Sequence, residues 1–410
     1  MTEHRKFILP NGITVSAEKL DYAKSVLISI WVLAGSRHEK PELFGISHLL
    51  EHLVFKGTQS RKIYHIANGI ESVGGYINAM TDKESTCYYV RIPADQLDRG
   101  LDILTDLVFH PVFKATDLEK EKQVVIDELM SVEDNLEDWI GDVFEEQVFA
   151  GTDLAHPVIG TRESVQGIQL KDIEERAKFH LDPSKILITV SGQFNFSVLE
   201  KKLIKYTTFS SVSTALPGVS IPASDLTGDI LLKKPVNQSH LVIGRNAAAL
   251  NDDKSSSLML INAVLGGGMS SRLNLKIRER YGFCYSIYSF TSFYSDTGAF
   301  GIYAATDPGK FGKMESLVKK ELDLLQKDSL TPREFRQVKQ SLIGSLEITS
   351  ESLSNRHSMM AKSEVHYGRF KPFSELIKEI EDVTSDQVRS YLDEYPLDGN
   401  LVKVIIQGES

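Results

Sequence analysis

Two histidines and a glutamate near residue 50 are the side chains best suited to chemistry in this 410-residue chain. They read His48-Leu49-Leu50-Glu51-His52, so on a helix both imidazoles project from one face, four residues apart. Two imidazole nitrogens at this spacing can bind one metal ion, and a carboxylate beside them can accept a proton from water. The pattern H-x-x-E-H therefore predicts a hydrolytic zinc site, with His48 and His52 as ligands and Glu51 as general base.

The apolar residues around this motif predict that its helix is largely buried. They form one broad stripe, made of Ile46, Leu49, Leu50, Leu53 and Val54. His48, Glu51, His52 and Phe55 share the remaining face, where Phe55 is expected to contact the substrate. The alternative is a helix with two surface histidines and no chemistry, but titratable groups beside a core usually have a partner that compensates their desolvation. Ser47 precedes His48 and is expected to be an N-terminal helix residue rather than a nucleophile.

A catalytic zinc ion needs a third protein ligand, for which the best candidate is Glu128. Residues 117–129 have apolar positions typical of a helix, and Glu121 and Glu128 lie two turns apart on one face of it. Glu128 is predicted to bind the metal, and Glu121 to orient the ligands. Without the upstream histidines, these acids would be read as a solvated charged face.

Composition excludes several classes of protein. A formal net charge of −10 disfavours nucleic acid as a partner and favours cationic ones. No run of 18 apolar residues occurs, so no membrane span is expected. The chain begins with a strand-turn-strand pattern around residues 10–12, so no signal peptide is expected. With only Cys87 and Cys284 present, no disulfide is expected, which favours a cytoplasmic location.

The length predicts two domains. Residues 207–228 are rich in Ser, Thr, Pro and Gly, and are expected to link a zinc-binding domain, 1–206, to a second domain, 229–410. In both halves, strand-like apolar runs are separated by longer helical patterns. The predicted fold class is α+β, with two similar domains, each an antiparallel-rich sheet with helices packed on one face.

A weak internal repeat relates the two halves. An offset of 215 positions pairs Tyr88 with Tyr303, and pairs Glu128 with Ile343. Nothing like H-x-x-E-H occurs near Leu265, where the repeat would place it. The second domain is therefore expected to share the fold but to lack the metal.

Four motifs, in this order and spacing, resemble the pitrilysin, insulin-degrading-enzyme and mitochondrial-processing-peptidase family of zinc peptidases. They lie at residues 45–58, 74–81, 84–89 and 121–128. The resemblance implies a zinc-dependent endopeptidase of oligopeptides or unfolded segments, with one Zn²⁺ per chain. It also implies that each chain is a half-shell and that two half-shells enclose a chamber, so a homodimer is expected.

The same resemblance implies a set of substrate-binding residues. Residues 76–80 would be an edge strand that binds an extended peptide, with Asn78 and Ala79 nearest the cleavage point. In the second domain a glycine-rich loop begins at residue 266, and Arg278 and Tyr285 follow it. They match the pair that holds the substrate backbone in the family; without the family they would be a surface arginine and a strand tyrosine. The loop lacks the Gly-Lys-Ser/Thr ending of a phosphate-binding loop.

An acidic stretch after Glu128 suggests a specificity. In the processing-peptidase pattern, acids at the places of Asp138 and Asp142 receive an arginine near the cut. Four apart on a helix, their carboxylates could accept one guanidinium, which predicts a preference for basic residues; the alternative is a solvated face. Two other functions remain open: the catalytic subunit of a heterodimeric processing peptidase, and a non-catalytic organising subunit of the same fold.

Overall fold

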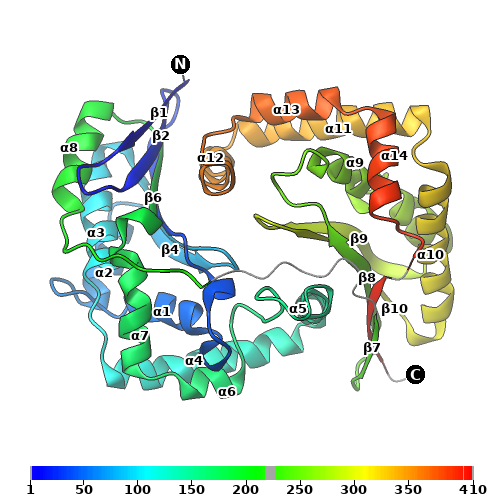
Figure 1. Ribbon diagram of the computed structural model, residues 1–410, viewed down its shortest axis with the longest axis horizontal. Coiled ribbons are helices and arrows are strands. Elements are labelled where there is room, and N and C mark those ends of the chain that lie inside the picture. The colour runs from blue at the N-terminus through cyan, green and yellow to red at the C-terminus, as the bar shows by residue number, and fades with distance from the viewer. Residues whose placement is uncertain (1, 218–227, 400, 409–410) are drawn as a thin grey trace. The chain divides into compact units, whose positions relative to one another are not determined.

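The computed structural model describes residues 2–217, 228–399 and 401–408, which form two compact units (Figure 1). Unit 1 contains Met1–Met130, His156–Val219 and Thr349–Pro372, and unit 2 contains Ser131–Ala155, Ser220–Ile348 and Phe373–Ser410. Each unit thus takes one short segment from the opposite half of the chain. Part of the predicted linker, 218–227, lies outside the described residues, and domain boundaries at 206 and 229 stay a prediction.

Unit 1 is built on a six-stranded sheet with the order β1-β2-β6-β3-β5-β4. Its strands are β1 (Thr2–Ile8), β2 (Thr14–Leu20), β3 (Ser25–Val32), β4 (Tyr76–Thr81), β5 (Thr86–Pro93) and β6 (Ile186–Gly192). All neighbours are antiparallel except β2 and β6, which are parallel. Strand β4 is at an edge, as predicted for residues 76–80.

Among the described residues, unit 2 repeats this topology without a counterpart of β1, in a five-stranded sheet with the order β7-β11-β8-β10-β9. Its strands are β7 (Gly228–Lys233), β8 (Ser239–Ala247), β9 (Cys284–Phe293), β10 (Gly298–Thr306) and β11 (Val402–Gln407). Only β7 and β11 are parallel, as β2 and β6 are in unit 1. Because order and strand directions match, the predicted repeat and fold class are confirmed.

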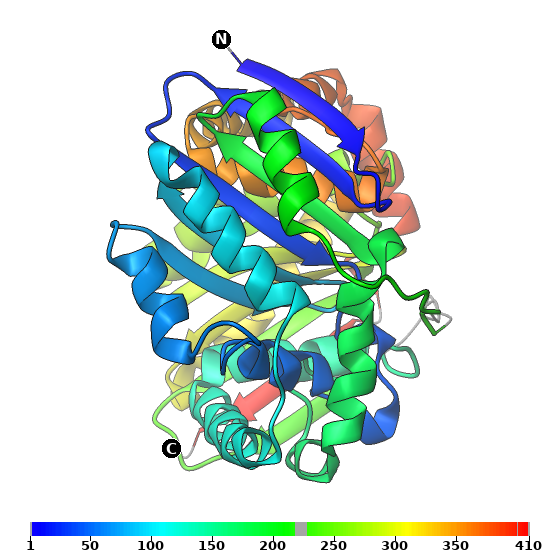
Figure 2. The same ribbon diagram turned by 90° about the vertical axis from the view of Figure 1, so that its left-hand side faces the viewer.

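In each unit, the main hydrophobic core lies between one face of the sheet and a layer of helices. In unit 1 these are α1 (Ile46–Val54), α2 (Ile63–Glu71), α3 (Leu97–Phe109), α4 (Ala115–Asp134), α6 (Arg162–Gly167), α7 (Leu170–Ala177) and α8 (Phe196–Tyr206). In unit 2 they are α9 (Ser255–Gly266), α10 (Phe311–Asp328), α11 (Pro332–Ser350), α13 (Phe373–Asp382) and α14 (Ser385–Glu394). Figure 2 shows α3 and α8 lying over the sheet of unit 1. Alternate residues of β3, such as Ile28 and Ile30, face this core.

The exchanged segments each place a helix on the other face of the sheet, which the sequence did not predict. Helix α12 (Leu353–Tyr367) contacts β2, β3 and β6 in unit 1, and α5 (Leu136–Val148) contacts β8 and β11 in unit 2. The contacts differ in character. On α5, Ile140 and Phe144 pack against apolar strand residues, whereas His357 of α12 is hydrogen-bonded to Ser29 at 2.6 Å and Ser191 at 3.0 Å.

The structure also bears on two expectations from composition, which concern membrane-spanning helices and the two cysteines. In the part of the chain that the structure describes, no helix is both long and apolar enough to cross a membrane. Cys87 and Cys284 are both buried free thiols, so neither forms a disulfide.

Candidate metal centre

Helix α1 carries the H-x-x-E-H motif and is fixed at its first turn. It begins after Gly45, whose φ of 90° and close approach to the Ile159 carbonyl oxygen require glycine. The buried Glu39 carboxyl accepts the backbone N–H groups of Gly45 and Ser47, at 2.7 and 2.8 Å, and so satisfies amides that the helix leaves unpaired. Arg176 donates to the Ser47 hydroxyl at 2.7 Å. Ser47 is therefore an anchored helix residue, as expected.

The side chains of His48, His52 and Glu128 converge, with one ligand atom of each lying within 4.8 Å of the others. The Oε2 atom of Glu128 lies 3.8 Å from His48 Nε2 and 3.6 Å from His52 Nε2. These distances are too long for hydrogen bonds, but they approach the roughly 3.4 Å between two ligands of a tetrahedral zinc ion with bonds of about 2.1 Å. Two imidazoles and one carboxylate thus fit a catalytic zinc ion.

Burial prepares His48 for a metal. Burial first, and the neighbouring His52 second, together lower the pKa of His48 to about 4. At neutral pH the imidazole is therefore uncharged and keeps the lone pair that a metal ion needs. The imidazole rings of His48 and His52 lie with their centroids 4.7 Å apart.

Glu121 orients one of these imidazoles. Its Oε2 lies 3.3 Å from His52 Nδ1, which donates to the carboxylate and leaves Nε2 for the metal. Lys56 binds the other carboxylate oxygen, Oε1, at 2.6 Å. The predicted supporting role of Glu121 therefore agrees with the geometry. Lys56 was not predicted from the sequence, although it lies four residues after His52, just past the end of α1.

Glu51 lies beside the three convergent groups and is held by a strand residue. The Thr81 hydroxyl at the end of β4 donates to Glu51 Oε2 at 2.6 Å. Burial raises the pKa of the Glu51 carboxyl, whereas this hydrogen bond and the nearby His52 act in the opposite direction. Thr81 belongs to one of the quoted motifs, but nothing in the spacing assigned it a contact with Glu51.

Three predicted substrate residues also lie in unit 1. Asn78 is exposed on β4, and Ala79 next to it packs against the main core. The Ala79 backbone N–H donates to Asn78 Oδ1 at 2.9 Å. Phe55 follows the last residue of α1 and is half-buried, with its ring centroid 6.5 Å from that of Tyr88.

The remaining four predicted residues belong to unit 2, whereas the metal ligands belong to unit 1. Arg278 lies in a π-helical segment, Asn274–Glu279, of a kind frequent at functional sites, and is exposed. Tyr285, on the edge strand β9, is 84% exposed. Among the described residues, neither side chain has a hydrogen-bond or ion-pair partner.

Asp138 and Asp142 both lie on α5, as predicted, one helical turn apart. Asp138 is exposed and accepts a hydrogen bond from Asn135, the residue before the helix, at 2.5 Å. Asp142 is half-buried. The structure therefore gives Asp138 a local role at the start of α5, beside any role in binding a substrate.

Family profiles match most of the chain. The profile described as "Insulinase (Peptidase family M16)" matches residues 14–162, and that described as "Peptidase M16 inactive domain" matches residues 167–342. The chain is 32% identical to the zinc protease YmxG of Bacillus subtilis over 94% of this chain and 93% of that protein. It is 30% identical to a zinc protease of Streptomyces coelicolor, over 94% of this chain and 86% of that protein.

Solved structures share the fold at lower identity. A protease from Helicobacter pylori superimposes with a TM-score of 0.93 at 21% identity, covering 99% of this chain and all of that one. A chain of the Complex III2 structure from Candida albicans gives a TM-score of 0.84 at 19% identity, covering 98% of this chain and 95% of that one. At these identities the likeness concerns the fold alone.

Proposed function

Because this chain belongs to peptidase family M16 and is a zinc protease, we propose that it is an endopeptidase of oligopeptides or unfolded protein segments. One observation carries this proposal: the Glu51 carboxyl interacts electrostatically with His52 and Glu128, two of the three convergent metal-binding groups, and is hydrogen-bonded to the last residue of the edge strand β4. A peptide bound along that strand would pass beside a general base. We assign His48, His52 and Glu128 as the ligands of one zinc ion per chain.

Each group then has one task. Zinc, when bound, supplies positive charge that polarises the scissile carbonyl and acidifies water. Glu51 accepts the proton of the attacking water and returns it to the leaving amine. Glu121 keeps His52 in the orientation that leaves Nε2 free. A serine or cysteine nucleophile has no part in this mechanism.

Strand β4 would receive the substrate as an added strand. Its outer edge is unpaired in unit 1, so an extended peptide can continue the sheet by backbone hydrogen bonds. The incoming peptide would displace Asn78 Oδ1 from the Ala79 amide. Phe55 would contact a substrate side chain close to the cut.

We propose a homodimer in which unit 2 completes the site of the partner chain. In the single-chain members of the family that this chain resembles, the binding Arg and Tyr come from the half opposite the zinc. Arg278 and Tyr285 support such a role, because both are exposed and neither side chain has a hydrogen-bond or ion-pair partner in the part of the chain that the structure describes. Two such half-shells would enclose the substrate in a chamber.

Asp138 and Asp142 would give this chamber a preference for basic residues near the cut. The exposed Asp138 carboxylate and the half-buried Asp142 are one helical turn apart, a spacing suited to one guanidinium. The buried free thiols of the two cysteines support a reducing compartment, for which we propose the cytoplasm.

Two alternatives fit less well. A non-catalytic organising subunit, of the kind suggested by the likeness to a Complex III2 chain, would not need three convergent metal-binding residues and a carboxylate beside them. A catalytic subunit that requires a different, metal-free chain would not need Arg278 and Tyr285 of its own. The presence of both sets in one chain favours the homodimer.

The test separates the ligands from the base. Glu51→Gln removes the proton acceptor but no ligand, so it is expected to keep zinc and to lose about 100- to 10,000-fold in kcat on a peptide library read by mass spectrometry. His48→Ala is expected to lose both zinc and activity. If Glu51→Gln proves as empty of zinc as His48→Ala, the division of roles is wrong.

A further inference from the structure

Thr81 is placed so that it connects the open edge strand to the general base. It is the last residue of β4, and its hydroxyl donates to Glu51 Oε2 at 2.6 Å. Within the described residues this is the one hydrogen bond to the Glu51 side chain. The base on α1 is thus held by the strand that is proposed to receive the substrate.

Thr81 is itself held by its own hairpin. In the antiparallel ladder it pairs with Thr86 of β5, across a four-residue connection. The Asp82 carboxylate closes this connection by accepting the backbone N–H groups of Glu84 at 2.8 Å and Ser85 at 2.6 Å. The backbone of Thr81 is therefore held independently of Glu51.

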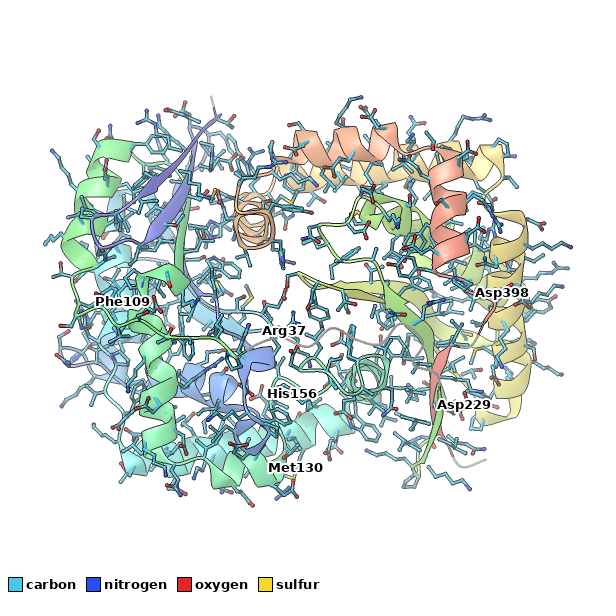
Figure 3. The ribbon with its side chains drawn as sticks, viewed as in Figure 1. Arg37, Phe109, Met130, His156, Asp229 and Asp398 are labelled. Atoms are coloured by element: carbon cyan, nitrogen blue, oxygen red, sulfur yellow. The ribbon has the colours of Figure 1, made fainter. Side chains whose placement is uncertain are left out.

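The hairpin is also anchored to the segment that precedes α1. The backbone N–H of Ser36 donates to Asp82 O at 3.1 Å, and that of Arg37 donates to Lys83 O at 2.9 Å. The Lys83 ammonium binds the backbone carbonyl of His156, and Arg37 and His156 are both labelled in Figure 3. The hairpin, the segment before α1 and the loop at His156 are therefore connected by hydrogen bonds within unit 1.

A glutamate side chain has three rotatable bonds, so an unrestrained carboxylate samples many orientations. With Oε2 bound to Thr81, rotation is restricted and Oε1 is left to accept a proton. We propose that Thr81 is a positioning residue for the reaction, which aims the Glu51 carboxylate and aligns it with a peptide bound along β4. This inference rests on the proposed role of Glu51 as the base.

The contact also explains how substrate binding and chemistry would be coupled. A peptide strand added to β4 extends the ladder that already fixes Thr81, so it would further restrict the hydroxyl that holds the base. The Thr81 hydroxyl controls the orientation of the Glu51 carboxylate and not the affinity for the peptide. The expected effect of removing it is therefore on kcat and not on KM.

The test compares two substitutions of Thr81. Thr81→Val keeps the shape and removes the hydroxyl, and is expected to lower kcat about 10- to 100-fold, the range for one hydrogen bond to a charged group. Its KM, its zinc affinity measured by chelator competition, and its melting temperature are expected to stay at wild-type values. Thr81→Ser keeps the hydroxyl and is expected to retain most of kcat. Thr86→Val, the cross-strand partner without a contact to Glu51, serves as the matched control.

The proposal is overturned if Thr81→Val keeps wild-type kcat, if it raises KM alone, or if Thr81→Ser is as impaired as Thr81→Val. Glu51→Gln is measured in parallel. Loss of activity in Glu51→Gln together with full activity in Thr81→Val rejects only the role of Thr81. Full activity in Glu51→Gln rejects the base itself, and with it the basis of this inference.

Discussion

Apart from β1, which has no counterpart among the described strands of unit 2, the two units have the same sheet order and the same strand directions. Among the described residues, however, only unit 1 brings potential metal ligands together. At the place that the repeat pairs with Glu128, α11 carries Ile343, which packs against the core of unit 2. Arg336 stands at the place of Glu121. Helix α9, which follows β8 as α1 follows β3, is buried on most sides and has no histidine.

The comparison shows that the sheet and its helices form a scaffold that does not specify chemistry. A few side chains on α1 and α4 make the difference. In unit 2 the same scaffold instead presents Arg278 and Tyr285 on the surface. Each of the following experiments either separates the contributions of the two units or tests whether the difference between them is as large as proposed.

The largest effect is expected from combining two inactive chains. Glu51→Gln disables unit 1, and Arg278→Ala disables unit 2. If the site is completed by the partner chain, a fully exchanged equimolar mixture is expected to recover about a quarter of wild-type activity, because half of the dimers are mixed and each has one intact site. Peptide hydrolysis before and after exchange measures this, with each variant alone as the control. Absence of recovery after verified exchange would mean that each site is completed within its own chain.

A smaller effect is expected from the acids of α5, which belong to unit 2. Asp138→Asn with Asp142→Asn is expected to narrow the advantage of Arg over Ala near the cut by about 1–3 kcal/mol, the range for a charged hydrogen bond. The measurement is kcat/KM for paired peptides. Glu133→Gln with Asp134→Asn removes the same charge from nearby exposed positions and is expected to keep the advantage. If both double variants lose the same part of the Arg advantage, the preference would come from the general negative charge of this region and not from a specific contact with Asp138 and Asp142.

Two similar lysine–glutamate pairs allow a direct comparison of the units. Lys56 binds the buried Glu121 at 2.6 Å in unit 1, and Lys276 binds the buried Glu321 at 2.7 Å in unit 2. Lys56→Met is expected to weaken zinc binding about tenfold, the lower end for residues that orient metal ligands. Lys276→Met is expected to leave zinc affinity unchanged. Zinc affinity is measured by chelator competition. Equal zinc affinities in the two variants would show that Lys56 does not help to orient the metal ligands.

The exchanged helices predict different responses to pH. Burial lowers the pKa of His357 on α12 to about 3, from an ordinary value of 6.5. Below pH 6.5 the unfolded chain binds a proton that the folded chain does not, so the free energy of unfolding falls as the pH drops from 6.5 towards 3. The slope from this group is about 1.4 kcal/mol per pH unit, or about 2 kcal/mol at pH 5.

Denaturant titrations at pH 7 and pH 5 test this difference. His357→Gln is expected to lose less stability than wild type between the two pH values. Phe144→Leu on α5, which changes only apolar packing, is expected to lower stability equally at both. Identical pH dependence in wild type and His357→Gln would show that His357 is not held neutral in the folded chain.

Much of the fold and of the metal centre followed from local patterns. The buried stripe on α1 and the helix that carries Glu128 were predicted, because each depends on a spacing of residues that local geometry imposes. The edge strand β4 was expected from the resemblance to the peptidase family rather than from spacing. The repeat was visible as an offset of 215 positions because corresponding elements occur in the same order. The exchange of α5 and α12 was not predicted, because a helix pattern says which face is buried but not which sheet buries it.

By itself, the sequence determined the kinds of side chains at the site and their spacing along two helices, which is sufficient to specify two imidazoles, two carboxylates and zinc chemistry. Only the tertiary structure decided which groups support them. Thr81 reaches Glu51 across 30 residues, and His357 reaches Ser29 across 328. Such contacts depend on how sheets and helices pack, because hydrogen bonds between distant segments form only where the folded backbone brings donor and acceptor within about 3 Å.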